Sequence, residues 1–310
     1  MPVLLVRHLT TYVYRQPVQL GQHRLMVRPR ESHDQRMLDA SLQITPTPAT
    51  LRWTHDVFSN SVALATFAGR TPELRVESTV RLLHTPVCSA AFDMDPGAER
   101  YPFSYDPADL PDLARSMERG HADPDRVLDR WARGFCRREG VGTHDLLVDM
   151  THEIRRTLTY VARPEAGTQT PLQTLKLGRG TCRDFAVLMM EAVRSLGFAA
   201  RFVSGYIHSP ARASSRNRGG GSTHAWVQVF LPGAGWVEFD PTNGIVGNRD
   251  LVRVAVARDP HQAVPLSGTW TGFPSDYLRM EVEVDVTASA ADDPQPLPLL
   301  LATLGQDQAS

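Results

Sequence analysis

The period of the hydrophobic pattern changes once along this chain, and this change limits the folds that the chain can adopt. Up to about residue 95, apolar residues alternate with polar ones or form short β-branched and aromatic runs, and helical spacing is absent. Such runs are typical of β-strands, and they occur at residues 3–14, 22–27, 40–45, 61–67 and 74–83. We therefore predict an all-β domain over residues 1–95, either a sandwich or an open barrel.

Residues 96–110 carry prolines and little periodicity, and we predict that they form a linker. Apolar residues then recur every three or four positions, which predicts helices at residues 111–118, 123–137 and 143–158. Later apolar runs predict strands at residues 200–207, 224–231, 236–240 and 278–286. Residues 111–287 are therefore predicted to be an α+β domain, and residues 288–310 a loosely held tail.

Composition and charge argue against several classes of partner. The formal net charge is −1 and 22% of the residues are charged, so we expect no nucleic acid partner and no membrane partner. The eleven histidines and three cysteines show no HxH, HExxH or CxxC spacing, so we expect no metal and no cofactor. This use of cysteine suits a reducing compartment, and no apolar stretch resembles a signal peptide or approaches the roughly 18 residues that span a membrane. We therefore expect a cytoplasmic protein, and its oligomeric state stays open.

A helix is predicted to begin at Cys182, and this position affects the reactivity of the cysteine thiol. Its apolar positions form one buried stripe, which consists of Phe185, Leu188, Met189, Ala192, Val193 and Leu196. Gly197 is a natural stop, and Thr181 with Asp184 fits the capping-box pattern, so Cys182 occupies the first helical position. The partial positive charge and free N–H groups at a helix start favour a thiolate and can stabilise an oxyanion. A cysteine alone at such a position is more often an inert packing residue, so the downstream residues decide between these interpretations.

His224 and Asp240 are predicted to belong to one antiparallel hairpin, whose turn is Pro232-Gly-Ala-Gly235. His224 and Trp226 share one face of the first strand, because side chains alternate along a strand. If the loop holds three residues with a glycine in the left-handed conformation, Leu231 opposes Gly235, and Asp240 opposes Trp226 and lies diagonal to His224. Diagonal neighbours lie roughly 7–8 Å apart, within reach of a His–Asp hydrogen bond. A loop of two or four residues would instead place the two side chains on opposite faces.

These positions suggest a thiol nucleophile with a general base and an orienting carboxylate. Cys182 is the candidate nucleophile, His224 the base that takes its proton, and Asp240 the group that orients His224 and stabilises its charged form. Gly178 and Gly180 precede the cysteine and are predicted to let a substrate backbone approach closely. The non-catalytic alternatives are that His224 is a half-buried packing residue and that Asp240 is a turn residue at the end of a strand.

Other residues receive weaker assignments. Trp226 and Tyr206 are assigned either to a cleft wall or to ordinary core packing, and Asp184 to a helix cap rather than to catalysis. Cys88 and Cys136 are expected to be inert. Residues 209–222 are predicted to form a mobile surface loop near the cleft, and we hypothesise that this loop shapes substrate access.

Several blocks of the sequence resemble the transglutaminase-like core of bacterial proteins. The matching residues are Gly180-Thr-Cys182-Arg-Asp184, Gly197, Val203-Ser-Gly-Tyr206, His224-Ala-Trp226 and Trp236-Val-Glu-Phe-Asp-Pro-Thr242. This resemblance covers about residues 120–245 and implies a papain-like α+β fold, with the nucleophile on a helix and the histidine and aspartate on adjacent strands. The N-terminal part is similar to the β domain that precedes this core in bacterial members, through His8-Leu-Thr-Thr-Tyr-Val-Tyr14, Gly21-Gln-His-Arg-Leu25 and Arg28-Pro-Arg30.

The resemblance leaves three functions open. A thiol peptidase or amidase releases the acyl group to water, whereas a transglutaminase transfers it to an amine, and both use the same three residues. Many bacterial members of the family look like proteases, which favours hydrolysis. A non-catalytic binding scaffold is the third possibility, against which the intact set of Cys182, His224 and Asp240 argues. The expected substrate is a peptide, a protein or a γ-glutamyl amide.

Overall fold

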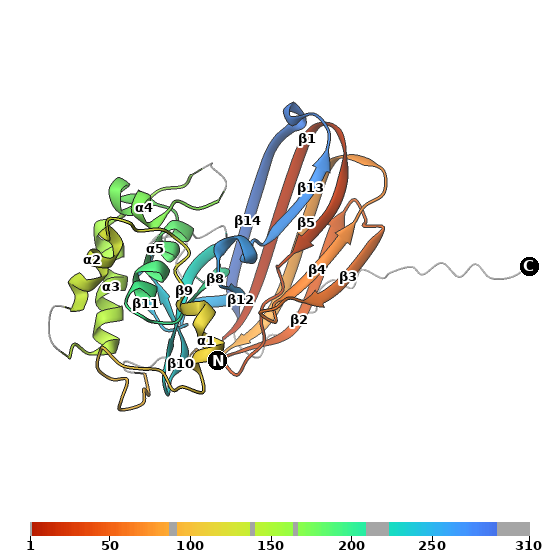
Figure 1. Ribbon diagram of the computed structural model, residues 1–310. Helices are drawn as coiled ribbons and strands as arrows, with labels where there is room; N and C mark the ends of the chain where they lie inside the picture. The colour runs from red at the N-terminus through yellow and green to blue at the C-terminus, as the bar shows by residue number, and fades with distance from the viewer. Residues whose placement is uncertain (1, 87–91, 137–139, 164–166, 209–222, 290–310) are drawn as a thin grey trace, which may run out of the picture.

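The computed structural model describes residues 2–86, 92–136, 140–163, 167–208 and 223–289. An antiparallel β-sheet lies beside a mixed core of helices and strands (Figure 1). The predicted class, an all-β N-terminal region followed by an α+β core, is confirmed. The predicted loop at residues 209–222, Cys88 and the predicted tail beyond residue 289 lie outside the described residues.

The N-terminal sheet is built around one long strand, β1 (Val3–Leu25). On one edge, β1 pairs with β5 (Arg70–His84) and then with β4 (Ser61–Thr66), while β2 (Gln35–Thr45) pairs with β5 and β3 (Thr50–His55) pairs with β4. The separate strands predicted at residues 3–14 and 22–27 are therefore parts of one strand. Strand β3 was not predicted, because all of its residues are exposed and a strand exposed on both faces shows no apolar alternation.

The other edge of β1 is covered by strands from the far end of the sequence. Strand β14 (Tyr277–Ser289) pairs with β1 from Val3↔Ser289 to Tyr14↔Tyr277, and β13 (Leu266–Thr271) continues along β1 to Leu25. The predicted core range of 111–287 is therefore wrong for these two strands, and residues 288–289 belong to β14 rather than to a tail. The physical reason is that both edges of β1 carry backbone N–H and C=O groups that need partners, and a strand from any part of the sequence can supply them.

The core contains a five-stranded antiparallel sheet in the order β11-β10-β9-β8-β12. Its strands are β8 (Ala200–Ile207), β9 (His224–Leu231), β10 (Gly235–Asp240), β11 (Ile245–Val246) and β12 (Leu251–Ala257). The predicted ranges of β8, β9 and β10 agree with the structure to within one residue. Strand β12 was not predicted, because every one of its residues is buried and such a strand lacks the alternation of buried and exposed positions.

Five α-helices accompany this sheet in the described part of the chain. They are α1 (Leu110–Met117), α2 (Val127–Arg133), α3 (Thr143–Thr157), α4 (Pro171–Leu177) and α5 (Cys182–Ser195). The short strands β6 (Thr159–Tyr160) and β7 (Arg179–Gly180) pair in parallel, and 3₁₀ turns occupy Gly134–Cys136, Pro260–Ala263 and Pro274–Asp276. Helix α4 was not predicted, because it contains Pro171, a residue that is rare inside helices. Pro171 is instead the first helical residue, where its missing N–H costs nothing, and Thr170 forms a capping box with Gln173.

A buried charged layer joins the N-terminal sheet to the core. Arg253 on β12 donates hydrogen bonds to Asp34, at 2.5 Å, and to Glu238 on β10. Burial by itself would lower the pKa of Arg253, but the two carboxylates raise it above its usual range. Leu4 on β1 belongs to the same apolar cluster as Val252 on β12. Because one layer of apolar and ionic contacts spans both parts, the N-terminal sheet packs directly against the core and is not joined to it by a linker alone.

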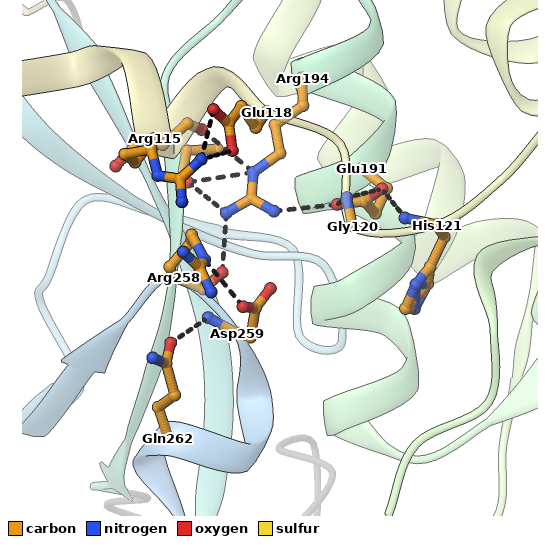
Figure 2. Close-up of polar contacts among 11 residues, drawn as sticks. Arg115, Glu118, Gly120, His121, Glu191, Arg194, Arg258, Asp259 and Gln262 are labelled. Carbon is orange, nitrogen blue, oxygen red and sulfur yellow. Dashed lines mark hydrogen bonds and ion pairs between the residues drawn. The ribbon is translucent and has the colours of Figure 1, made fainter. Parts of the chain in front are cut away.

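A second buried ion pair anchors the end of α5 that lies away from Cys182 (Figure 2). Arg194 donates to Glu191 at 2.9 Å and to the carbonyl oxygens of Ala200 and Arg258, and Glu191 accepts from the backbone N–H groups of residues 120 and 121. Both side chains are almost completely buried. Removing one partner of such a pair leaves an uncompensated buried charge, so this cluster holds α5 firmly against the sheet.

Candidate active site

Helix α5 begins at Cys182, as predicted, and its first turn is capped from both sides. The hydroxyl of Thr181 accepts a hydrogen bond from the N–H of Asp184 at 3.4 Å, and the carboxylate of Asp184 accepts from the N–H of Thr181 at 2.9 Å. Cys182 is a free thiol with only 6% of its surface exposed. The cap therefore sets Cys182 at the helix start, where the N–H groups of the first turn have no partner inside the helix.

Asp184 is confirmed as a cap, and it also holds the preceding segment in place. Its carboxylate accepts from Arg163 at 3.1 Å and from the N–H of Gln169 at 2.7 Å. Gly180 has a local role here, since a Cβ at this position would lie 2.9 Å from the Cβ of Asp184. Gly178 ends α4 in the left-handed conformation. The turn between α4 and α5 thus accounts for both glycines. The predicted approach of a substrate backbone is not needed to explain them.

The hairpin of β9 and β10 has the register that the three-residue loop predicts. Leu231 pairs with Gly235, and the pairing continues to Phe239↔Val227, which places Asp240 opposite Trp226. Gly233 and Gly235 both have positive φ, the conformation that a tight loop of this length requires. His224 and Asp240 consequently share one face of the sheet.

His224 donates a hydrogen bond from Nε2 to Oδ2 of Asp240 at 2.8 Å, and both side chains are buried. Asp240 also accepts from Nδ2 of Asn243 at 2.8 Å and from the N–H of Thr242 at 2.9 Å. Burial alone would raise the pKa of Asp240, but the charge of His224 and these hydrogen bonds lower it. Burial alone would lower the pKa of His224, but the Asp240 carboxylate raises it above its usual value. The pair is therefore poised as a carboxylate and an imidazolium.

Cys182 approaches this pair from α5. Its side chain is among the groups that raise the pKa of His224. The second ring nitrogen, Nδ1, makes no hydrogen bond to any described residue. The structure thus pairs His224 with Asp240 through one ring nitrogen, and Cys182 acts on the pKa of the same ring from the start of α5.

Three neighbouring residues have roles that sequence reasoning missed or left open. Asn243 supports Asp240, and its place two residues after Pro241 gave only a turn signal. Trp226 is completely buried and stacks on His224 with ring centroids 5.9 Å apart, so it packs behind the ring. The hydroxyl of Tyr206 bonds to Nδ1 of His8 on β1 at 2.9 Å, so this side chain ties the core to the N-terminal sheet.

The other features of the described residues lie apart from these three. A cavity of about 660 Å³ lies at the opposite end of β9 and β10, where it is lined by Phe230, Trp236 and Arg201. Cys136 is half-buried, and burial raises the pKa of its thiol. Among the residues the structure describes, no three His, Cys, Asp or Glu side chains are grouped to hold a metal ion, and no helix is long and apolar enough to cross a membrane.

Comparison with known proteins identifies the two parts of the chain. Residues 4–82 match the bacterial transglutaminase-like N-terminal region, and residues 120–241 match the transglutaminase-like superfamily. An uncharacterized protein of Mycobacterium leprae is 34% identical over 129 residues, which are 42% of this chain and 46% of that protein. An uncharacterized protein of Mycobacterium tuberculosis is 28% identical over 274 residues, which cover 85% of this chain and 86% of that protein.

The fold is also that of a solved structure, a candidate cysteine protease from Cytophaga hutchinsonii. The two structures superpose with a TM-score of 0.67 over 94% of this chain and 92% of that chain, at 20% sequence identity. The superfamily match and this fold support a papain-like thiol enzyme. The chain thus combines a region that matches the N-terminal region of bacterial transglutaminase-like proteins with a core that matches the transglutaminase-like superfamily.

Proposed function

We propose that this chain is a cysteine-dependent hydrolase of amide or peptide bonds, which acts through Cys182, His224, Asp240 and a thioester intermediate. The observation that carries the proposal is the 2.8 Å hydrogen bond between His224 and Asp240, made on the same hairpin face next to the start of α5. A buried carboxylate that raises the pKa of the histidine makes an imidazolium available beside the thiol.

The steps follow from these positions. The Cys182 thiolate attacks the carbonyl carbon of the amide, and the N–H groups at the start of α5 stabilise the oxyanion that forms. The imidazolium of His224 gives its proton to the amine, which leaves as the C–N bond breaks. His224 then takes a proton from water, and the hydroxide attacks the thioester. Its collapse releases the carboxylic acid and restores the thiolate and imidazolium, while Asp240 holds the ring in orientation throughout.

Two other functions share parts of this site. A transglutaminase would resolve the same thioester with an amine in place of water, and the outcome depends on how well the site excludes water. A scaffold would use the N-terminal sheet to bind a partner, and its core would have no catalytic activity. We favour hydrolysis over transamidation because a solved structure with the same fold is described as a candidate cysteine protease. We favour it over the scaffold because His224 and Asp240 are paired on one face of the hairpin.

The deciding experiment is a panel of α-peptide and γ-glutamyl amide substrates, each incubated with and without a primary amine. We expect amine release and a free carboxylic acid in both conditions, and an acyl adduct on the Cys182 peptide after acid quenching and mass spectrometry. Incorporation of the added amine in place of water would assign a transglutaminase. Absence of both turnover and adduct on every substrate would favour the scaffold.

Asp240→Asn should move the alkaline side of the pH–activity profile to lower pH. The variant loses the charge that raises the pKa of His224, so the imidazolium is lost at a lower pH. Activity at the optimum should fall by less than the roughly 10²–10⁴-fold that a general base supplies, because Asp240 orients rather than transfers protons. The measurement is kcat/KM between about pH 4 and about pH 10, with Asp259→Asn, paired to Arg258 away from the site, as the matched control.

Stability gives an independent readout of the same pair. Because the folded-state pKa of His224 is raised, its stabilisation is complete below the unfolded value of about 6.5 and is lost as pH rises through the folded value. The difference in unfolding free energy between the wild type and Asp240→Asn should therefore be larger near pH 6 than near pH 9. An unmoved alkaline limb together with a pH-independent difference would show that Asp240 does not control His224.

A further inference from the structure

Arg183, the residue directly after Cys182, carries a guanidinium group without a counterpart among the described residues. It occupies the second position of α5, and its Nη2 atom is buried with no hydrogen-bond partner. Arg183 as a whole is partly exposed, and its other two guanidinium nitrogens are not among the buried atoms without a partner. Burial lowers the pKa of Arg183, and the groups that oppose this effect are Cys182 and Asp184, its neighbours in the chain.

Neither carboxylate of the candidate site pairs with this cation. Asp184 is occupied by Arg163, by the N–H of Gln169 and by the N–H of Thr181. Asp240 is occupied by His224 and its own turn. A partly buried cation that lacks a hydrogen-bonded anion is costly, so its retention beside the nucleophile calls for a reason.

The chain treats its other buried guanidinium groups differently. Arg194 donates to Glu191 and to three backbone carbonyl groups, and Arg253 donates to two carboxylates. Arg201 lies 4.0 Å from the ring centre of Trp236 and donates to Gln228. These three arginines are satisfied by the protein itself, whereas the buried Nη2 atom of Arg183 has no partner among the described residues.

The unpartnered polar atoms of the described chain concentrate at the same place. Five buried side-chain atoms lack a partner, and four of them belong to Arg183, His224, Trp226 and Thr242, each at or within two residues of Cys182, His224 or Asp240. The proposed mechanism uses only the His224 atom. Trp226 and Thr242 are completely buried, whereas Arg183 is partly exposed, so Arg183 is the one of these residues that a bound molecule can reach.

We propose that Arg183 forms an anion subsite that binds a carboxylate of the acyl substrate close to the bond that Cys182 attacks. The planar guanidinium matches a carboxylate through two parallel hydrogen bonds, and such charge-assisted bonds are stronger than neutral ones. The preferred substrates are then amides whose acyl part carries a free carboxylate near the scissile carbonyl. This assignment rests on the proposed thiol hydrolase function and names the substrate class for it.

The test compares two alkylating agents of the same size, iodoacetate and iodoacetamide, on Cys182. In both reactions the thiolate displaces iodide and forms a thioether, so the reagents differ in charge and not in chemistry. With the wild type we expect saturation by iodoacetate and a higher iodoacetate-to-iodoacetamide rate ratio at Cys182 than at Cys136. In Arg183→Gln this ratio should fall by about 10- to 100-fold, as expected for losing hydrogen bonds to a charged group, while the iodoacetamide rate changes less than about threefold.

Arg183→Lys is the matched control, because it keeps the charge and loses the planar fork, and it should give an intermediate ratio. Acetate should also protect wild-type Cys182 from iodoacetamide, and chloride at equal ionic strength should not; this measurement needs no variant. Equal slowing of both reagents in Arg183→Gln, or a wild-type ratio like that of Cys136 without acetate protection, would overturn the subsite. Alkylation requires no turnover, so its outcome is separate from that of the substrate panel.

Discussion

Cys182→Ala is expected to abolish amide hydrolysis while the protein stays folded. The sulfur is the only atom that the proposed chemistry bonds to the substrate, so its loss removes the thioester route altogether. We expect kcat/KM to fall by at least about 10³-fold. The remaining activity would come from substrate binding and oxyanion stabilisation alone. The cap that starts α5 is made by Thr181 and Asp184, so the helix start does not depend on the thiol.

The measurement pairs substrate turnover with thermal unfolding. Deleting one buried sulfur should cost about 1 kcal/mol, comparable to removing a small buried group. Cys136→Ala is the matched control, since it removes a half-buried free thiol on the turn after α2 and should leave turnover unchanged. Full activity in Cys182→Ala, or lost activity in Cys136→Ala with an intact fold, would contradict the assignment of the nucleophile.

His224→Ala should be nearly as damaging, because the imidazole both generates the thiolate and protonates the leaving amine. A general acid or base contributes roughly 10²–10⁴-fold, and here one ring serves both steps, so a loss near the upper end is expected. The rate of Cys182 alkylation near neutral pH should fall with it, because the cation beside the thiol is gone.

His23→Ala is the matched control for loss of a buried histidine. His23 lies on β1 in the N-terminal sheet, where its ring bonds to the carbonyl oxygen of Gly21 at 3.0 Å and contacts Phe67. We expect a similar loss of stability and little change in kcat/KM. Turnover and alkylation that survive in His224→Ala at wild-type rates would remove His224 from the mechanism.

The features that sequence reasoning predicted well are those set by neighbours in the chain. The start of α5 follows from Thr181 and Asp184, which are three residues apart and satisfy each other's N–H groups. The meeting of His224 and Asp240 follows from a loop of three residues, because loop length sets hairpin register and register sets which side chains share a face. The resemblance to the transglutaminase-like core was recognisable because its sequence blocks follow one another in the expected order.

Other features have local signals that misled. Pro171 suggested a break and is the first residue of α4. Strand β12 is buried throughout and strand β3 exposed throughout, so neither shows the alternation that marks a half-buried strand. In these segments the sequence does not show which side chains are buried, and burial decides whether a segment can be recognised as a helix or a strand.

The remaining features depend on contacts between distant parts of the chain. A period of two identifies residues 277–289 as a strand but does not name its partner, and only the folded structure pairs Val3 with Ser289. The same holds for the layer in which Arg253 joins Asp34 and Glu238, and for the bond from Tyr206 to His8. The lack of a partner for Arg183 Nη2 among the described residues is likewise a property of its three-dimensional surroundings.

The sequence by itself therefore determined the fold class, the position of Cys182 and the hairpin that joins His224 to Asp240. The last two rest on backbone geometry and hydrogen bonds between residues at most 16 positions apart. The tertiary structure decided which strands complete the N-terminal sheet, which charges are paired and which are left free. It decided them because hydrogen bonds and ion pairs between distant segments are chosen by proximity in the folded state, and proximity across hundreds of residues leaves no period in the sequence.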